Sequence, residues 1–123
     1  MKVGNTMDNK KLKNCFKLSS KVTVYIPSTK DINKEIDNTE YVNRTAILLS
    51  ECFGGATSTP ALGYWTSQTA GLVKEKTTLV FAYADETSLN NNLEKVIDWC
   101  ESLKTELSQD AIALELNGEM YFI

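Results

Sequence analysis

The residues that could carry chemistry gather in one stretch, from Cys52 to Glu75 (CFGGATSTPALGYWTSQTAGLVKE). It combines glycines, a proline and a tryptophan with closely spaced Ser and Thr hydroxyls. This composition is typical of backbone that turns tightly or lies close to another molecule. We therefore expect a functional surface here, and we add a second tryptophan further along the chain. The candidate binding residues are Thr57, Ser58, Thr59, Tyr64, Trp65, Thr66 and Trp99.

Tyr64 and Trp65 are the aromatic pair of this stretch, and Gly63 precedes them. Adjacent residues of a strand face opposite sides, so we expect one ring to pack beneath a helix and the other to point outward. The outward ring, which we expect to be Trp65, would anchor a partner or stack on a base or sugar. Packing at the edge of the core is the alternative for both rings, and for Trp99 as well.

Several kinds of catalytic site lack the residues they need. The chain has no histidine, which removes Ser–His and Cys–His nucleophile pairs and histidine-bearing metal sites. Its three cysteines are widely spaced and form no C-x-x-C motif, which argues against structural zinc and dithiol redox chemistry. The carboxylates fall at helix starts, as in Asp85–Glu86, or on solvated helix faces. We therefore predict no catalytic residue, no cofactor site and no metal site.

The segment Phe53–Thr59 (FGGATST) has some likeness to a phosphate-binding loop. In a true P-loop a strand precedes the glycines, and a helix opening with Gly-Lys-Ser/Thr follows them. Here a predicted helix precedes the glycines and a predicted strand follows. The segment therefore favours a helix C-terminus that leads into a strand over a phosphate site.

Length and charge limit the kind of protein. A chain of 123 residues is long enough for one domain and one core. The net charge of −3 conceals an asymmetry: residues 1–34 carry eight lysines against Asp8 and Asp31, whereas residues 35–123 carry five basic and fourteen acidic residues. We predict a flexible, lysine-rich arm over residues 1–17 and a single acidic domain over residues 18–123. An acidic domain disfavours nucleic-acid binding.

The location follows from two absences and from the thiols. No apolar run is long enough to span a membrane, and no secretory signal is recognisable behind the N-terminal lysines. Two of the cysteines fall on predicted buried helix positions, which favours reduced thiols. We expect a cytoplasmic protein that does not bind membranes.

Hydrophobic periodicity predicts the elements. Alternation indicates strands over 18–26, 61–66 and 77–84, the last of them a central strand because both of its faces are apolar. A polar loop is expected over 27–37. Apolar residues at helical spacing indicate one helix that opens near Asp37 and ends at Gly54, and a second that runs from Leu89 to Leu107. Asn117-Gly118 is a strong hairpin signal between strands 112–116 and 119–123.

The resulting order is strand, helix, strand, strand, helix, strand, with an extra C-terminal strand. This order predicts an α+β, ferredoxin-like sandwich in which a mostly antiparallel sheet carries two helices on one face. The opposite sheet face stays open, and an exposed apolar sheet face is typical of a dimer or partner surface. A homodimer through this face is therefore one expectation.

Three strings carry a resemblance to known sequences: VTVYIPST, FGGATSTPALGYWTSQTAGLVKEKTTLVFAYA and the C-terminal AIALELNGEMYFI. Over roughly residues 20–123 the chain resembles a family of small uncharacterised proteins from plasmids, phages and integrated elements of Firmicutes. The resemblance implies a mobile-element origin and supplies no catalytic residue.

Two hypotheses for function remain. The first is a small non-catalytic protein that binds a host or element protein, for example an inhibitor of a defence nuclease such as an anti-CRISPR, since an acidic surface can occupy a nucleic-acid channel. The alternative is a small-molecule-binding domain or small enzyme whose site is formed by residues 54–72, with Ser, Thr and Tyr hydroxyls orienting the ligand. The absence of a recognisable catalytic constellation favours the first.

Overall fold

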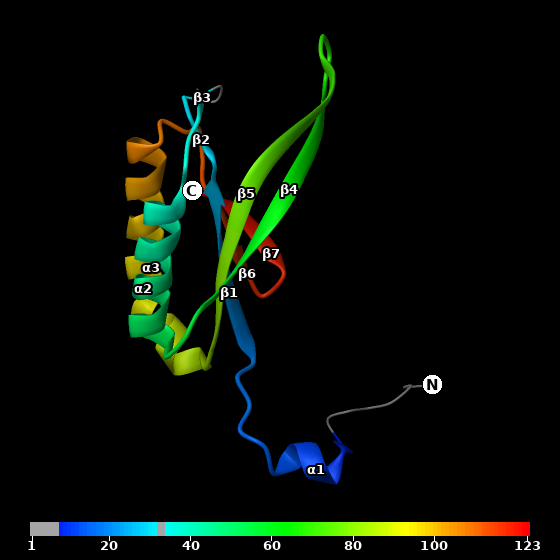
Figure 1. The fold of residues 1–123 in the computed structure, drawn as a ribbon. Helices are drawn as coiled ribbons and strands as arrows, with labels where there is room; N and C mark the ends of the chain where they lie inside the picture. The colour runs from blue at the N-terminus through cyan, green and yellow to red at the C-terminus, as the bar shows by residue number, and fades with distance from the viewer. Residues whose placement is uncertain (1–7, 32–33) are drawn as a thin grey trace.

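A five-stranded antiparallel sheet forms the body of the molecule (Figure 1). The computed structural model describes residues 8–31 and 34–123. In space the strands follow the order β4-β5-β1-β6-β7. Their bounds are β1 Ser20–Pro27, β4 Thr57–Ser67, β5 Gly71–Ala84, β6 Ala113–Leu116 and β7 Glu119–Phe122.

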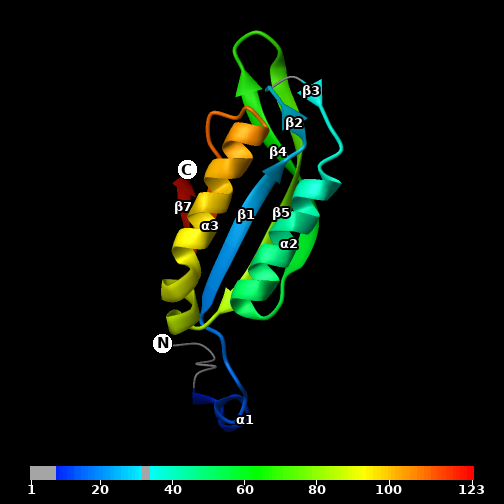
Figure 2. The same ribbon diagram turned by 90° about the vertical axis from the view of Figure 1, so that its left-hand side faces the viewer.

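Two long helices, α2 (Thr39–Phe53) and α3 (Glu86–Glu106), lie side by side on one face of this sheet (Figures 1 and 2). Without β7, the chain order β1-α2-β4-β5-α3-β6 and the spatial order β4-β5-β1-β6 are those of a ferredoxin-like sandwich. The predicted fold class is thus confirmed, including both helices on one face and the C-terminal hairpin.

Local chemistry explains where the elements begin and end. The Asp85 carboxylate accepts a hydrogen bond from the Ser88 amide at 2.7 Å and so caps the start of α3. Gly54 ends α2 in the left-handed conformation, with φ of 92°. Asn117 and Gly118 have φ of 52° and 86°, the values that a two-residue hairpin between β6 and β7 requires. The C-terminus is fixed because Ile123 and Ile112 exchange two backbone hydrogen bonds.

The core lies between the sheet and the helices. Strand β1 sends Val22, Val24 and Ile26 into it, as its alternation predicted. Helix α3 contributes four fully buried positions of its predicted stripe, counting the residue just after its end. The buried core cluster is Val22, Val24, Ile26, Leu49, Val80, Ala82, Val96, Cys100, Leu103, Leu107, Ile112 and Leu114.

The hairpin of β4 and β5 is much longer than predicted. The strand expected over 61–66 spans eleven residues, and the strand expected over 77–84 begins at Gly71. Pro60 is tolerated within β4 because β4 is an edge strand of the sheet. We call the outer halves of the two strands, residues 61–76, the arm. Its base lies beside the start of α2, and its outer end extends past the ends of the helices (Figure 1). The strand expected over 77–84 is an interior strand, as predicted, because β5 lies between β4 and β1; β1 occupies the middle of the strand order.

Two further expectations need adjustment. The predicted polar loop over 27–37 contains a small hairpin of β2 (Thr29–Lys30) and β3 (Lys34–Glu35), while residues 32–33 lie outside the described residues. Helix α2 begins at Thr39 with Asn38 as its first flanking residue. Asp37 still contributes, since its carboxylate accepts hydrogen bonds from the amide and hydroxyl of Thr39.

The N-terminal segment is exposed over residues 8–17 and holds a one-turn helix, α1 (Lys10–Lys13), capped by the Asn9 side chain. The rest of the predicted lysine-rich N-terminal segment, residues 1–7, lies outside the described residues. All three cysteines are free thiols. Among the helices of the described ranges, none combines the length and apolar character that a membrane span needs.

Candidate functional site

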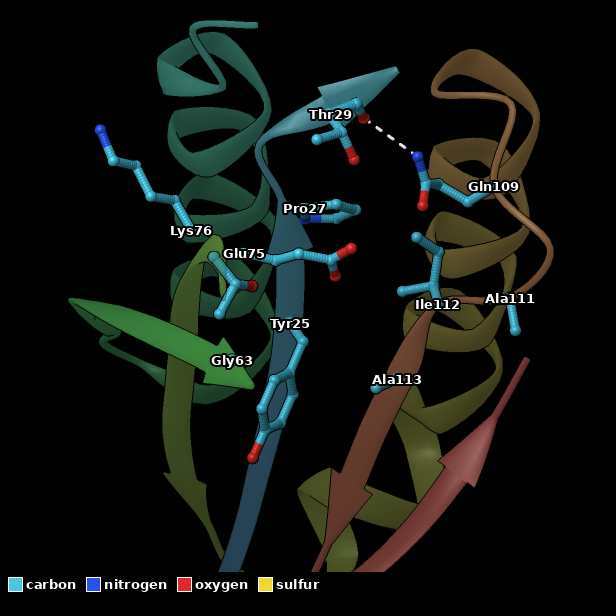
Figure 3. A pocket seen from close by; sticks show the side chains of 11 residues that line it. Tyr25, Pro27, Thr29, Gly63, Glu75, Lys76, Gln109, Ala111, Ile112 and Ala113 are labelled. Atoms are coloured by element: carbon cyan, nitrogen blue, oxygen red, sulfur yellow. Dashed lines mark hydrogen bonds between the residues drawn. The ribbon is translucent and has the colours of Figure 1, made fainter. Parts of the chain in front are cut away.

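The sheet face opposite the helices carries the most chemically promising hollow of the molecule. Cross-strand partners share a face, so Thr23 and Tyr25 of β1 lie on this side together with Phe81, Leu79 and Glu115. Where β1 ends, the base of the arm and the chain entering β6 enclose a pocket of about 270 Å³ (Figure 3). Its lining residues are Tyr25, Pro27, Thr29, Gly63, Glu75, Lys76, Thr77, Gln109, Ala111, Ile112 and Ala113.

Tyr25 lies at the floor of the pocket beside a carboxylate. Its hydroxyl donates a hydrogen bond to Oε1 of Glu115 at 3.4 Å. Burial raises the pKa of Tyr25, and the negative charge of Glu115 and the hydrogen bond to it raise the pKa further. A neutral phenol next to a carboxylate can donate to a ligand, and its ring offers a π face to a cation.

Glu75 supplies the pocket with its own carboxylate. Figure 3 shows this side chain lying across β1 toward Ile112, whereas Lys76 points away from the cavity. The indole Nε1 of Trp65, on the neighbouring strand, donates a hydrogen bond to Oε1 of Glu75 at 3.2 Å. The bond fixes one carboxylate oxygen and leaves the other available to a ligand, so Glu75 and Glu115 make this face a place for positive charge.

The far rim is closed by Gln109, which follows α3. Its side-chain Nε2 donates to the carbonyl oxygens of Thr29, at 3.0 Å, and Leu107, at 3.1 Å (Figure 3). Thr77, on the opposite wall, donates its hydroxyl to the Ile26 carbonyl at 3.0 Å. The rim is therefore pinned by side chain–backbone bonds from elements far apart in the sequence.

Two other hollows are less suited to chemistry. A groove of about 650 Å³ lies on the helix side, between the start of α2 and the base of the arm, and across it Lys76 pairs with Glu35 at 3.7 Å. A third hollow, of about 360 Å³, lies where Gly54 and Gly55 lead into β4, and it includes Phe81. We favour the open-face pocket because its lining joins the Glu75 carboxylate to Tyr25, a tyrosine whose pKa is raised, and such a combination is typical of functional sites.

None of the seven predicted binding residues lines this pocket. Thr57 and Thr59 lie on the open face near the start of β4, whereas Ser58 and Thr66 point to the other side. Of the predicted stretch 54–72, Gly63 lines the pocket and Trp65 reaches it through Glu75. The stretch therefore forms an edge of the site and not the whole of it.

The prediction that one ring of the Tyr64–Trp65 pair packs beneath a helix is wrong. The rings do face opposite sides of the sheet, but Tyr64 is 56% exposed and Trp65 is 51% exposed. The reason is the length of the arm, which carries this part of β4 past the ends of both helices (Figure 1). No helix is left for the inward ring to pack against.

Trp99 belongs to the scaffold. It packs at the edge of the core between α2 and α3, where its Nε1 donates to Oγ1 of Thr45 at 2.8 Å. The guanidinium carbon of Arg44 lies 4.7 Å from the centre of its ring, and Arg44 also pairs with Glu106 at 3.3 Å. These contacts engage the indole with its own protein.

Sequence reasoning missed Tyr25, Glu75, Thr77 and Gln109. A usable signal existed for Glu75, because a hairpin turning at residues 68–70 must pair Gly63 with Glu75 and Trp65 with Val73. Reading 61–66 as a separate short strand hid this register. No signal in the sequence brings Gln109 to Thr29, since that contact depends on how the end of α3 meets β2.

Within residues 8–31 and 34–123, no group of three or more Cys, Asp or Glu side chains is arranged to hold a metal ion.

The comparisons with known proteins find a similar fold among solved structures. No family model and no curated protein sequence matches the chain. Among solved structures, the chain is similar to a phage SAM lyase in complex with S-methyl-5'-thioadenosine, with a TM-score of 0.60, 16% identity, and 85% of this chain and 88% of that chain covered. It is also similar to a phage SAM lyase in the apo state, with a TM-score of 0.61, 19% identity, and 86% and 89% covered.

This finding overturns the first functional hypothesis. A non-catalytic protein that acts as an anti-defence inhibitor was inferred from the absence of a recognisable catalytic constellation. Both similar structures are lyases, and one of them holds a small molecule. They support the alternative of a small-molecule-binding domain or small enzyme. The absence of histidine was weak evidence against an enzyme, because it excludes only those reactions that require a histidine side chain.

Proposed function

We propose that this chain binds an adenosine-derived sulfonium compound in the open-face pocket and cleaves it, as a lyase acting on S-adenosylmethionine. The observation that carries the proposal is the likeness, over 85% of the chain, to a phage SAM lyase that holds S-methyl-5'-thioadenosine. The pocket chemistry supports it independently, because carboxylates and aromatic rings attract a sulfonium cation.

The residues have distinct roles in this proposal. Glu75 faces the positive sulfur, and Tyr25 offers a π face. Trp65 holds the Glu75 carboxylate, and Gln109 and Thr29 bound the rim. The pocket's 270 Å³ is just below the roughly 300–1,000 Å³ typical of ligand pockets, so a nucleoside-sized ligand would extend out of it along the open face. The three free thiols fit a reducing compartment, and we place the protein in the cytoplasm.

The reaction needs no histidine. Release of S-methyl-5'-thioadenosine from S-adenosylmethionine breaks the bond between sulfur and the four-carbon amino acid fragment. Both electrons of that bond stay on sulfur, which leaves as a neutral thioether and so requires no general acid. The carbon that loses its bond to sulfur can form a new bond in one of two ways without water. Either the fragment's own carboxylate attacks this carbon and a lactone forms, or the neighbouring carbon loses a proton and an alkene forms.

In the first route, opposite charges within the substrate neutralise each other as the bond breaks. Excluding water from the carboxylate and the sulfonium therefore lowers the activation barrier to lactone formation. In this route the protein acts by holding the substrate in its reactive conformation. In the second route a base is required, and Glu75 is the carboxylate that lines the pocket. The two co-products have the same mass but are distinguished by proton NMR, since only the alkene shows vinyl signals.

The proposal is tested by incubating the protein with S-adenosylmethionine and measuring S-methyl-5'-thioadenosine by liquid chromatography and mass spectrometry. We expect time-dependent product from the native chain. Glu75→Gln should lower turnover roughly tenfold to a hundredfold, because it removes the charge that faces the sulfonium. Glu94→Gln, on the exposed face of α3, is the matched control and should leave turnover unchanged.

A second pair of variants tests the place of the ligand. A Cβ added at Gly63 would lie 3.7 Å from the Glu75 carbonyl oxygen, an ordinary contact, so Gly63→Ala narrows the pocket without forcing the backbone. We expect weaker binding of S-methyl-5'-thioadenosine by titration calorimetry. Gly55→Ala, where the added carbon meets nothing within 4 Å, should bind normally. Absence of both product and binding in the native protein would refute the proposed function.

A further inference from the structure

Positive charge is concentrated in residues 8–17, which we call the basic segment. Every residue of this segment is exposed. The rest of the domain, residues 18–123, has eight basic and fifteen acidic residues, and we call it the acidic body. The basic segment has one acidic residue, Asp8, and its lysines are Lys10, Lys11, Lys13 and Lys17.

The basic segment lies away from the acidic body, so the body does not neutralise its charge. Helix α1 projects beyond the end of the sheet at which β1 begins, clear of α2 and α3 (Figures 1 and 2). Each ion pair found among the described residues lies within the body, and none includes a lysine of the basic segment. Like charges held close together repel one another, and a bound polyanion would relieve that repulsion.

An exposed aromatic ring is the second feature of the basic segment. Phe16 is 86% exposed, the largest exposed fraction among the large apolar side chains of the described residues. It directly precedes Lys17 and follows the lysines of α1. Lysines interleaved with an exposed ring are typical of proteins that bind single-stranded nucleic acid, because the lysines contact phosphates and the ring stacks on a base.

The geometry favours a single strand over an anionic membrane. A membrane is an extended surface, so one that touched the basic segment would also face the acidic body and repel it. A single strand is narrow and can follow the segment without approaching the body. Helices that lie in a membrane interface also need a broad apolar face, whereas α1 is a single turn with Leu12 as its one apolar residue.

We propose that the basic segment binds single-stranded nucleic acid without sequence preference, with phosphates on its lysines and a base stacked on Phe16. Every base has a π face, which is why stacking of this kind tolerates any sequence. DNA and RNA share the phosphates and the bases, so both belong in the test. The binding is separate from the open-face pocket and does not depend on cleavage of S-adenosylmethionine.

The experiment is fluorescence anisotropy, in which the full-length native chain is titrated into a labelled strand of about twelve nucleotides, as DNA and as RNA. We expect binding with a Kd below ~100 µM at about 20 mM salt. Four lysine–phosphate contacts to a single strand predict a slope of about −3 for log K against log salt. The affinity should therefore fall roughly fiftyfold between about 20 and 80 mM salt.

Two charge-matched variants locate the binding. Glutamine in place of all four lysines of the basic segment should weaken binding about tenfold or more and flatten the salt dependence. The matched control makes the same change at four exposed lysines of the acidic body, and it should stay within about threefold of the native affinity. These control positions are Lys30, Lys34, Lys74 and Lys95.

A second pair of variants tests the ring. Phe16→Ala should weaken binding about fivefold or more, because it removes the stacked base. Leu12→Ala is its match, since Leu12 is 51% exposed on α1 and has no ring, and it should bind the strand as the native chain does. Circular dichroism checks that each variant is folded.

Binding of either DNA or RNA with these dependences supports the proposal, and comparing the two identifies the preferred strand. No binding by the native chain up to ~100 µM at low salt refutes it. Equal losses in the two lysine variants also refute it, since only net charge would then matter. A Phe16→Ala variant that binds as tightly as the native chain refutes the stacking. Binding to vesicles of phosphatidylserine and phosphatidylcholine, but to neither strand, would assign the segment to a membrane instead.

Discussion

The two faces of the sheet are built from the same strands but follow different rules. The face toward α2 and α3 holds the aliphatic core, and its side chains alternate in the way the sequence predicts. The face away from the helices holds carboxylates, a tyrosine and exposed rings, and the buried hydroxyl of Thr23 on this face has no hydrogen-bond partner among residues 8–31 and 34–123. The difference teaches that the covered face provides stability, while the open face is free to carry polar groups that stability does not need.

The sharpest test of this contrast is a pair of leucine truncations. Leu103 of α3 is completely buried in the core, so Leu103→Ala should cost about 2–5 kcal/mol in the free energy of unfolding. Leu72→Ala, on the arm, should cost less than about 1 kcal/mol, since little apolar surface is buried there. Urea unfolding measures both. Equal losses would mean that the arm is part of the cooperative core.

The buried thiol of Cys100 should make the free energy of unfolding depend on pH. Burial, and then the charge of Glu101, raise the pKa of this thiol to about 12, from an ordinary value of 9.0. Between these values the unfolded chain releases the proton while the native chain keeps it, so stability is complete below pH 9 and falls as the pH rises toward 12. The loss amounts to up to about 4 kcal/mol.

Urea unfolding at a series of pH values measures this effect, and Cys100→Ala isolates it, since that variant should lose less stability over the same window. Thiol labelling provides an independent check. Cys15 is exposed and should react at once, whereas Cys100 should react only on unfolding. Rapid labelling of both thiols in the native protein would contradict the placement of Cys100 in the core.

The covered face could be predicted from the sequence because its signals are local. The stripe of α3, the Asp85 cap, the glycine that ends α2 and the Asn117-Gly118 turn each act within a few residues, and all are confirmed. The order of elements then left few topologies, and the ferredoxin-like one was correct.

The open-face pocket could not be predicted in the same way, because it depends on distance in the sequence. Tyr25, Glu75 and Gln109 meet only when β1, the arm and the end of α3 are placed together. The length of the arm decided the fate of Tyr64, and a pattern broken by Pro60 and Gly63 concealed that length. A polar residue on an uncovered face also leaves no hydrophobic period to recognise.

Two buried threonines, one on each face of the sheet, allow the contribution of a single hydroxyl to stability to be compared between the faces. Thr45, on α2, donates to the Tyr41 carbonyl at 2.7 Å and accepts from Trp99, so Thr45→Val should cost about 1–3 kcal/mol. Thr23, 2% exposed on the open face, makes no such bond, so Thr23→Val should be neutral or stabilising by up to about 1 kcal/mol. Thermal unfolding of the two isosteric variants measures the difference. A Thr23→Val variant as unstable as Thr45→Val would show that the open face has a hidden hydrogen bond.

The smallest effects on stability are expected at the two rings of the arm. Both are about half exposed beyond the helices, so Tyr64→Ala and Trp65→Ala should each change the free energy of unfolding by less than about 1 kcal/mol.

The two rings should differ in their effect on turnover. Trp65→Ala releases the Glu75 carboxylate and should lower turnover of S-adenosylmethionine several-fold, and Trp65→Phe, which keeps a ring but not the Nε1 donor, should behave similarly. Tyr64→Ala, on the other side of the arm, should leave turnover unchanged. Loss of several kcal/mol in either alanine variant would restore the view that one ring is a core residue, and equal turnover in Trp65→Phe and the native chain would show that the indole bond does not position Glu75.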